Sequence, residues 1–399
     1  MKKLTIYYFC FEGFKKIGRL NNHITETVNR LSKLGNQVYF FNPDIIIPAL
    51  DKRVIQKLIP VINKPLLKWI TFDLISFFTM CKNALKQPPD IIYYRESSSL
   101  VPLLVARLFS RPLFIEINGW VVDELAAINY AKYKLKWIKF IQTINYKNAD
   151  RLIPVSNGLK KIIIKNYHIN PEKISVVNNG TNPEKYYPIE KSVARKKINL
   201  DRQRKIIGFI GGCYPHHGIQ YLIKAAPLLI KKYPDILFVV AGDGIMLKSW
   251  KNLAHHLNVM EHFYFPGNVS YDLAPFYINA YDICVAPWDK DLVGKVGLSP
   301  MKLFDYLACA RPVIASSVDG IDDIVTKNDI GNTVDVKDPD KFTKAIIAVY
   351  ENIDKFEEKA RRGYEFVINQ YTWQKTSEKI YQLMVNEING TKINPNNIK

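Results

Sequence analysis

The chain has 399 residues, of which 48% are hydrophobic and 23% are charged, which suits two folded domains and excludes a disordered or collagen-like protein. Its formal net charge of +19 indicates attraction to an anionic partner, such as a membrane surface, a nucleic acid or a nucleotide-linked substrate. Its five cysteines are isolated, without a C-x-x-C pair, which favours free thiols in a reducing compartment over disulfides or a zinc site. No apolar stretch reaches the roughly 20 residues of a spanning helix, so we expect a cytoplasmic protein, soluble or peripheral on the inner face of the cell membrane.

The first half alternates short apolar strands with helices, which is typical of a parallel sheet covered on both faces. Strands are expected at Leu4–Phe9, Val38–Phe41, Ile91–Tyr94, Leu113–Ile117 and Arg151–Val155. The first run lacks a small-residue cleavage site, so it is interpreted as a strand and not as a signal peptide. Between the first two strands, residues 23–34 are expected to form an amphipathic helix that ends at Gly35.

The second half repeats this plan. Strands are expected at Ile206–Ile210, Leu237–Ala241, His262–Phe265, Ile283–Ala286 and Pro312–Ala315. Helices are expected at Ile219–Tyr233, Asp340–Tyr350, Ile353–Gln370 and Thr376–Ile388. The pattern therefore predicts an α/β protein with two Rossmann-like domains facing each other across a cleft, with ligands at the carboxyl ends of the strands.

The predicted domain limits follow the change in composition between the halves. Residues 1–185 form the first domain, and residues 205–371 form the second. Residues 186–204, rich in Lys and Arg with little apolar periodicity, are expected to be a linker. The last helix, about residues 372–399, is expected to return to the first domain.

Paired glycines follow the first strand of the second half. Gly211 and Gly212 allow close approach of the backbone to a phosphate, and His217, at the entry to the next helix, could donate a hydrogen bond to it. Gly18 occupies the matching loop of the first half. No carboxylate or thiolate lies at metal-ligand spacing from the paired histidines, so a metal site is not expected.

A second candidate binding segment runs from residue 297 to residue 308. Pro300 suits a first helical turn because it needs no N–H donor there. Lys302 and Asp305, three residues apart, share the polar flank of the expected helix. A lysine and free N–H groups suit a phosphate, and a carboxylate suits the hydroxyls of a ribose. The alternative is an ordinary crossover helix whose lysine and aspartate are solvated.

With these residues in view, the chain resembles the GT-B glycosyltransferases, and among them the large retaining group called glycosyltransferase family 4. The resemblance covers nearly the full length and rests on the order and spacing of these segments: Gly18 to His23 with Gly35, Ala149–Ser156, Val177–Gly180, Phe209–Gly218, Ala241–Gly244, Phe265–Val269, Ala280–Pro287 and Gly297–Ala308. The Ser-Pro-x-Lys-x-Phe-Asp-Tyr form of the last segment resembles a subgroup that acts on cell-surface polysaccharides, including lipopolysaccharide.

The resemblance implies a retaining, metal-independent transferase. It would move a hexose-type sugar from a UDP- or GDP-sugar, its donor substrate, to a lipid-linked or saccharide acceptor, with no cofactor. By position, the implied donor site consists of Gly18, Gly211, Gly212, His217, Asn268, Val269, Leu298, Ser299, Pro300, Lys302 and Asp305. The backbone at Asn268 and Val269 would hold the base, and Asp305 the ribose.

The chain departs from the family pattern at the diphosphate. The family's arginine is Gly212 here and its lysine is His217, so two cations are missing, and Lys302 is the candidate replacement. The family's E-x7-E pair becomes Gly297 and Asp305, which removes the carboxylate that touches the donor sugar.

The histidine that many family members carry after the fourth strand of the first domain is Asn118 here. Strand alternation puts Glu116 on the same face as Asn118. We expect Asn118 to hydrogen-bond the donor sugar or its diphosphate, and Glu116 or Glu124 to orient hydroxyl groups. The alternative for Glu116 is a structural ion pair with a basic neighbour such as Arg95.

Two segments of the first half mix apolar residues with lysines. They are Val54–Leu85 and Tyr130–Lys147, the second with Trp137, Phe140 and Tyr146. Basic residues with interfacial aromatics suit an anionic membrane surface and a lipid-linked acceptor. The alternative is that these apolar residues form the core faces of two domain helices.

Other functions remain open at this point. A nucleic-acid-binding protein would explain the charge, but no recognised nucleic-acid-binding motif is present, so no nucleic-acid partner is expected. A non-catalytic GT-B subunit would explain the missing carboxylate and arginine. A sugar-nucleotide epimerase-like enzyme shares the fold, and fold alone does not separate it from a transferase.

Overall fold

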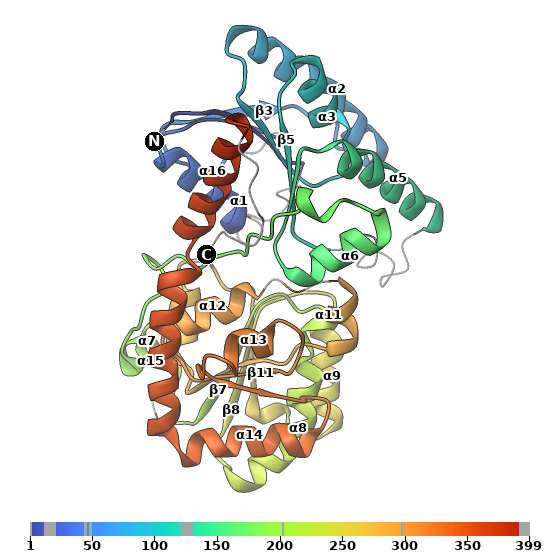
Figure 1. Cartoon of the computed structure of the whole chain (residues 1–399). Helices are drawn as coiled ribbons and strands as arrows, with labels where there is room; N and C mark the ends of the chain where they lie inside the picture. Colours follow the sequence, from blue (N-terminus) through green and yellow to red (C-terminus); the bar gives the residue numbers. More distant parts are fainter. Residues whose placement is uncertain are drawn as a thin grey trace. The chain divides into compact units, whose positions relative to one another are not determined.

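The computed structural model describes the chain except for residues 1, 12–20, 44–45, 48–49, 120–121, 123–130, 202, 297, 299 and 391–399. The described residues form two six-stranded parallel sheets with flanking helices (Figure 1). Each sheet belongs to its own compact unit. Unit 1 contains Met1–Asn179, Val296–Ser299 and Trp373–Lys399, and unit 2 contains Gly180–Lys295 and Pro300–Thr372. The prediction of an α/β protein with two Rossmann-like halves is confirmed.

The sheet of unit 1 has the strand order β3-β2-β1-β4-β5-β6, with all neighbours parallel. Its strands are β1 (Thr5–Phe9), β2 (Gln37–Pro43), β3 (Val54–Ile59), β4 (Ile91–Arg95), β5 (Leu113–Ile117) and β6 (Arg151–Pro154). The four central strands are almost fully buried, because helices cover both faces.

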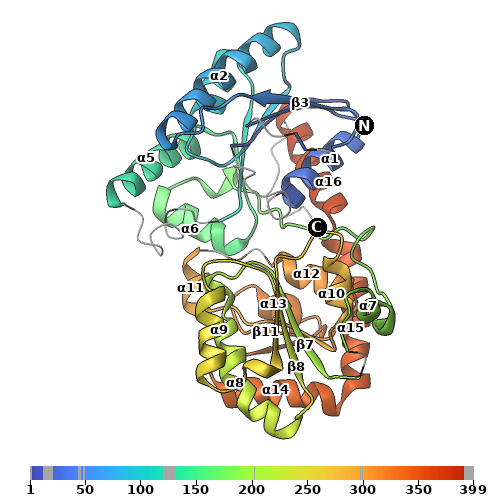
Figure 2. The ribbon, with the colours of Figure 1, turned by 180° about the vertical axis from the view of Figure 1, so that it is seen from behind.

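The two faces of this sheet carry different helices (Figure 2). One face packs against α1 (Asn21–Lys33) and α16 (Trp373–Ile388), through residues such as Val28 and Leu383. The other face packs against α2 (Pro65–Lys86), α3 (Val101–Leu108), α5 (Lys132–Asn148) and α6 (Asn157–Tyr167). A 3-10 turn, η1 (Pro171–Lys173), follows α6.

The C-terminal helix α16 belongs to the first unit, as expected. Its Tyr381 hydroxyl donates to the carbonyl of Lys2 at 2.7 Å, and its Glu387 pairs with Arg151 at 2.8 Å. The last helix thus completes the core of the unit that the N-terminus begins.

The sheet of unit 2 has the order β12-β11-β10-β7-β8-β9, again parallel throughout. Its strands are β7 (Ile206–Ile210), β8 (Leu237–Ala241), β9 (Phe263–Gly267), β10 (Ile283–Ala286), β11 (Val313–Ser316) and β12 (Asn332–Val334). Because β7 lies centrally, the loop after it opens at the middle of the carboxyl edge, where α/β sheets bind ligands.

The helices of unit 2 connect these strands in chain order. They are α7 (Lys191–Lys197), α8 (Ile219–Lys232), α9 (Leu247–His256), α10 (Ala274–Ala280), α11 (Lys290–Val296), α12 (Met301–Ala308), α13 (Ile321–Val325), α14 (Pro339–Glu351) and α15 (Ile353–Gln370), with 3-10 turns η2 (Pro215–His217) and η3 (Met260–His262). Among the described residues, no helix is both long and apolar enough to traverse a bilayer.

The stretch expected to be a linker is part of unit 2. Residues 191–197 form α7, whose first turn is capped by the Glu190 carboxylate, which accepts from the backbone N–H of Ser192 at 3.0 Å. Arg195 is buried and pairs with Asp282 at 2.9 Å. The linker interpretation of residues 186–204 was therefore wrong, because a high Lys and Arg content concealed a short helix with a buried ion pair.

Candidate functional site

The loop after β7 is fixed against the loop after β8. The Gly211 N–H donates to the carbonyl of Ala241 at 2.9 Å, and the Cys213 N–H donates to the carbonyl of Asp243 at 3.0 Å. Gly211 has φ of +149°, a conformation that side chains rarely adopt. A Cβ added at Gly212 would lie 2.6 Å from the Tyr214 ring. The glycine pair thus brings bare backbone to the carboxyl edge of the sheet.

Lys302, on the first turn of α12, reaches this loop. Its Nζ would lie 3.2 Å from a Cβ added at Gly211, and it sits 4.2 Å from the ring centroid of Phe209 and 5.8 Å from that of Trp288. The Nζ atom is buried and finds no hydrogen-bond acceptor among the described residues. Burial lowers the pKa of the Lys302 ammonium well below its usual range, while Cys213 acts weakly in the opposite sense. An ammonium without an acceptor in a buried site is costly, and an anion would relieve that cost.

The placement of α12 follows from its own sequence. The helix begins after Pro300, whose carbonyl accepts from the N–H of Leu303 at 2.9 Å. The hydroxyl of Tyr306, buried on α12, accepts from the N–H of Ile210 at 3.0 Å, which ties the helix to the end of β7. The first N–H groups of the helix have no partner within it, as at every helix start.

Two histidines stand at the turn into α8. The Nδ1 of His217 hydrogen-bonds the carbonyl of Gly212, and the two imidazole ring centroids lie 4.3 Å apart. Burial, reinforced by the charge of Lys302, lowers the pKa of His216 to about 4. His216 is therefore neutral at physiological pH.

Asp305 lies one turn after Lys302 on α12. Its Oδ1 accepts a hydrogen bond of 2.7 Å from the hydroxyl of Thr181, which is fully buried. The carboxylate is partly exposed and held in one orientation, as a group that accepts from a diol requires.

A second cluster lies at the carboxyl end of β5 in unit 1. Glu116 is 3% exposed and is surrounded by hydrogen-bond donors. Its Oε1 receives Arg95 at 2.6 Å, His23 at 2.9 Å and the Nδ2 of Asn118 at 2.6 Å. The hydroxyl of Tyr8 donates to Oε2 at 3.3 Å. Burial acts to raise the pKa of Glu116, but His23, Arg95 and Asn118 together hold it well below its usual range.

The amide of Asn118 is oriented by this carboxylate. Because an ionised carboxylate only accepts hydrogen bonds, the nitrogen of the amide must face Glu116. The Oδ1 atom then points the other way, where it is buried and finds no donor among the described residues. The side chain therefore offers an acceptor to a hydroxyl group.

The chain matches known sequence families along most of its length. Residues 20–185 match the family model described as Glycosyltransferase Family 4, and residues 190–366 match the one described as Glycosyl transferases group 1. The chain is a family 4-like glycosyltransferase of the GT-B fold. The resemblance noted in the sequence is thereby confirmed, as is the expectation of a transferase.

This glycosyltransferase is similar to several known proteins. It is 26% identical over 97% of its length to an uncharacterized glycosyltransferase of Methanocaldococcus jannaschii, all of which is covered. It is 26% identical to the UDP-Gal:alpha-D-GlcNAc-diphosphoundecaprenol alpha-1,3-galactosyltransferase of Escherichia coli, over 70% of this chain and 71% of that one. Its fold matches Anabaena HepE in complex with UDP-glucose with a TM-score of 0.74 and 16% identity, covering 96% of this chain and 100% of that one.

Within unit 2 of the glycosyltransferase, the structure brings Gly211, Gly212, His217 and Lys302 together at one edge of the sheet, with Asp305 one turn farther along α12. Lys302 points inward, over Phe209, so the alternative of a solvated lysine on a crossover helix was wrong. Pro300 is buried and precedes the first helical residue, where a first-turn position was expected.

The other residues expected at the donor site do not join this cluster in the described structure. Asn268 and Val269 follow β9, the edge strand, and Asn268 is exposed. Leu298, partly exposed, belongs to unit 1. Gly18 and Ser299 lie outside the described residues, as does Glu124.

Glu116 forms the ion pair with Arg95 that was the alternative to a role in orienting hydroxyl groups. Arg95 and Glu116 are register partners on β4 and β5, so their side chains share a face and form a cross-strand ion pair. With both oxygens occupied, Glu116 is built to position Asn118 and His23.

Several residues of these sites were not found from the sequence. Thr181 directly follows the Val177–Gly180 motif, and Trp288 follows the end of β10. Their positions after a motif and after a strand are the signals that could have identified them as neighbours of Asp305 and Lys302. His23 gave no such signal, because a histidine inside an amphipathic helix is more often part of the core.

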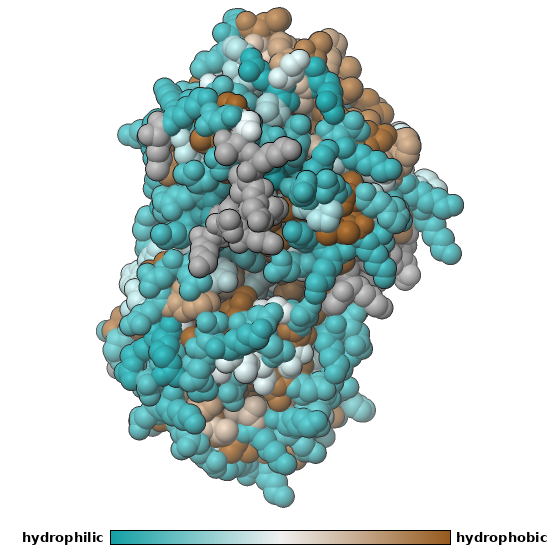
Figure 3. Space-filling model, viewed as in Figure 1, coloured by the Kyte–Doolittle hydropathy of each residue, from teal (hydrophilic) through white to brown (hydrophobic). Residues whose placement is uncertain are grey.

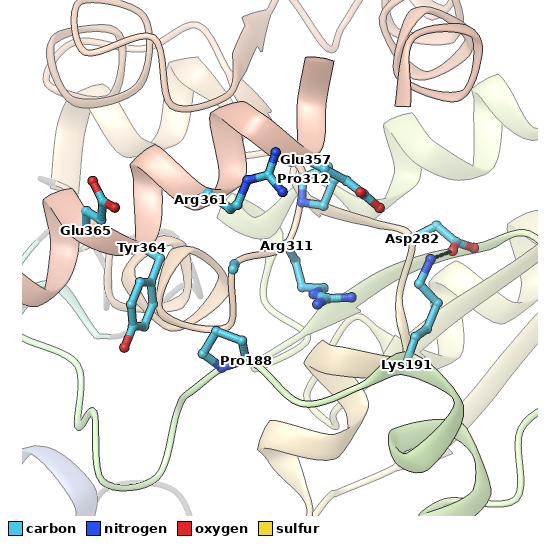
Figure 4. A pocket seen from close by; sticks show the side chains of 10 residues that line it. Pro188, Lys191, Asp282, Arg311, Pro312, Glu357, Arg361, Tyr364 and Glu365 are labelled. Carbon is cyan, nitrogen blue, oxygen red and sulfur yellow. Dashed lines mark hydrogen bonds and ion pairs between the residues drawn. The ribbon is translucent and has the colours of Figure 1, made fainter. Parts of the chain in front are cut away.

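A pocket of about 480 Å³ lies elsewhere in unit 2 (Figure 4). It is lined by Lys191, Asp282, Arg311, Arg361 and Glu365, among others. Asp282 and Arg311 precede β10 and β11, so this pocket opens at the amino edge of the sheet, opposite to the Gly211–Gly212 turn. Its charges are of both signs, with Lys191 and Asp282 paired at 2.5 Å.

Proposed function

We propose that this glycosyltransferase is a retaining, metal-independent hexosyltransferase that uses a UDP-sugar and a lipid-linked saccharide acceptor in surface polysaccharide synthesis. The observation that carries the proposal is the buried Lys302 ammonium beside the Gly211–Gly212 turn. This arrangement supports binding of a diphosphate by one lysine and backbone N–H groups, without the family's arginine. The printed activity of the Escherichia coli relative and the UDP-glucose bound to HepE support a UDP-sugar.

The proposed reaction breaks the bond between the anomeric carbon and the diphosphate oxygen. The acceptor hydroxyl forms its bond to the same face of the anomeric carbon, and its proton passes to the departing diphosphate. Lys302 and the first N–H groups of α12 stabilise the charge that grows on the leaving group, which is the role a metal ion has in other transferases. Asp305, oriented by Thr181, accepts from the ribose.

Asn118 is proposed to accept a hydrogen bond from a hydroxyl of the donor sugar through Oδ1. Glu116 acts through Asn118 as a positioning residue, because its own oxygens are already engaged.

A donor screen tests the proposal. The purified chain is incubated with UDP- and GDP-sugars and a bacterial lipid extract, and release of nucleoside diphosphate is measured with and without EDTA. We expect UDP release that EDTA leaves unchanged, and an unchanged anomeric configuration in the product by NMR. Donor binding without any transfer to the extract would instead indicate a non-catalytic subunit.

Variants then test the assigned residues. Lys302→Met should lower kcat by about 100-fold, the magnitude typical of losing one preorganised electrostatic group. Lys344→Met, at an exposed lysine on α14, is the matched control and should not change it. Asn118→Ala should raise the donor KM and lower kcat, with the melting temperature retained. Full turnover by both Asn118→Ala and Glu116→Gln would remove the assignment of the first-unit cluster.

A further inference from the structure

An apolar surface covers the outer side of unit 1. The helices α2, α3 and α5 pack side by side on one face of the sheet, since Phe72, Val105 and Tyr146 enter the same core cluster. Arg107 on α3 donates to the carbonyl of Asn148, the last residue of α5, at 3.1 Å, so α3 contacts both of its neighbours. We call the solvent-facing side of these three helices the outer face.

The helix α2 is apolar on two sides. Its inner side buries Phe72 and Met80 in the core. On its other side, Ile70, Leu74 and Phe78 follow one another at four-residue spacing, and Phe78 remains 62% exposed. Within the part of the chain that the structure describes, this second apolar stripe stays more than half exposed, which is unusual in a soluble domain, because an apolar stripe is normally buried against the protein.

The helix α5 divides along its length. Its second half is anchored by Ile141 and Tyr146, which are buried. Its first half is mostly exposed, with Tyr133, Trp137 and Phe140 on one stripe, and the Trp137 and Phe140 rings lie 5.7 Å apart. Of the aromatic residues singled out in the sequence, Tyr146 is therefore core, whereas Trp137 and Phe140 are surface.

Leu104 and Leu108 of α3 add two more exposed aliphatic side chains. Figure 3 shows hydrophobic residues gathered along the upper right edge of unit 1, where Figure 1 places α2 and α3. Contiguous exposure of this kind marks an interaction site more often than chance.

The charge of the outer face is almost entirely positive. The three helices together contain nine basic residues and one acidic residue, Asp73. The lysines of α5 at positions 132, 134, 136 and 139 are exposed and lie beside its aromatic stripe. Asp73 is turned toward Ser99, and burial raises the pKa of its carboxyl to about 6.

We propose that the outer face of unit 1 docks on an anionic lipid surface. Lysines attract the headgroups, while tryptophan, tyrosine and aliphatic side chains enter the boundary between headgroups and acyl chains. A second copy of the chain is a poorer partner, because two such faces would oppose like charges. A nucleic acid would pair with the lysines but leaves Leu74, Leu104 and Leu108 without a partner, since aliphatic side chains offer no stacking surface.

Docking goes beyond the proposed transferase activity. It is measured without donor or acceptor, so the docking proposal and the transferase proposal can be overturned independently. The full chain is floated with phosphatidylglycerol–phosphatidylcholine vesicles and, separately, with phosphatidylcholine vesicles. We expect flotation only with the anionic vesicles. Absence of flotation with anionic vesicles at low salt overturns docking, whereas failed UDP-sugar turnover with intact flotation overturns only the transferase proposal.

Two variants separate the charged and apolar contributions. Changing Lys132, Lys134, Lys136 and Lys139 to Gln should lower the vesicle partition coefficient by roughly 100-fold or more. The control variant changes four exposed lysines of unit 2 to Gln, at positions 224, 231, 248 and 344. This control should lower the partition coefficient far less. Equal losses in the two would mean that net charge alone attracts the chain and would overturn a defined face.

The apolar variant combines Phe78→Ser, Trp137→Ser and Phe140→Ser, all at exposed positions where folding, followed by circular dichroism, should survive. We expect roughly tenfold weaker partitioning, with Leu228→Ser on α8 of unit 2 as the control. Unchanged partitioning would overturn insertion. Sedimentation without lipid tests whether a second copy covers the face. If the parent chain forms a dimer and the apolar variant is a monomer, the outer face binds a second copy, and docking on lipid is overturned.

Discussion

The hydroxyl of Thr181 donates a hydrogen bond of 2.7 Å to Oδ1 of Asp305, and it connects residues 124 positions apart in the chain. The Thr181 N–H is itself held by the carbonyl of Tyr371 at 2.8 Å. The start of unit 2 and the end of α15 thus jointly fix the carboxylate that we assign to the donor ribose. The resemblance noted in the sequence aligns this carboxylate with the second residue of the family's E-x7-E pair.

Replacing Thr181 with Val tests this relationship. Valine keeps the shape of threonine but removes the donor, so Asp305 loses its orientation. We expect the donor KM to rise about tenfold, the effect of one hydrogen bond to a charged group, with kcat little changed. Steady-state kinetics with varied UDP-sugar measure this, and Thr181→Ser, which keeps a hydroxyl, should restore most of the affinity. An unchanged KM in Thr181→Val would show that Asp305 does not depend on this contact.

Most strands could be predicted from the sequence because they are continuous apolar runs between glycine, proline or polar residues. β5, β7, β8 and β10 were placed to the residue. The two strands that were missed, β3 and β12, are both edge strands. Their residues are mostly half-buried and include polar ones such as Gln56 and Asn332, so they lack the apolar continuity of a central strand.

The site was predictable in its glycines and less so in its side chains. Gly211 and Gly212 follow a recognisable strand, so their position at the sheet edge could be inferred. The inward turn of Lys302 could not, because it depends on Phe209 and Trp288, which come from other strands and their loops. Helical spacing alone placed Lys302 on a polar flank.

Lys302 should make UDP binding dependent on proton uptake. Burial lowers the pKa of its ammonium in the free protein, and a bound diphosphate raises it again, so binding takes up protons wherever the free lysine is partly neutral. Affinity for UDP should therefore fall as pH rises through the lowered pKa. Calorimetry at a series of pH values, in buffers of different ionisation enthalpy, measures the uptake. The series stays well above the pKa of His216, which is about 4, so that His216 remains neutral throughout.

The variants of that experiment are decisive. Lys302→Met should abolish the buffer dependence together with most of the affinity, and Lys344→Met should retain both. Parent protein that binds UDP with no proton uptake at any of these pH values would contradict a lowered pKa of Lys302 in the free protein.

Gly218 at the entry to α8 should be intolerant of any side chain. It has φ of +60°, and an added Cβ would lie 1.8 Å from the carbonyl oxygen of Pro287. We expect Gly218→Ala to lower the free energy of unfolding by about 3 kcal/mol or more, because backbone strain of about 1–2 kcal/mol combines with a clash that the loop must move to relieve. Urea unfolding measures the loss.

Gly320 supplies the matched control for Gly218. Its φ is +85°, but nothing lies within 4 Å of an added Cβ. Gly320→Ala should therefore show the strain alone, about 1 kcal/mol. Equal losses in the two variants would mean that the Pro287 contact is relieved without cost.

Asp73 should make the stability of unit 1 depend on pH in the direction opposite to an ion-paired carboxylate. Burial raises the pKa of its carboxyl from 3.8 to about 6, so the folded state binds more protons than the unfolded state between these values. Stability should accordingly fall as pH rises through this window and then level off.

Asp73→Asn removes the titration and retains an oxygen that can accept from Ser99. The difference in unfolding free energy, variant minus parent, should grow by about 2 kcal/mol between about pH 4.5 and pH 7.5. Urea unfolding at the two pH values measures it. A constant difference for Asp73→Asn across the range would mean that its carboxyl titrates as in the unfolded chain.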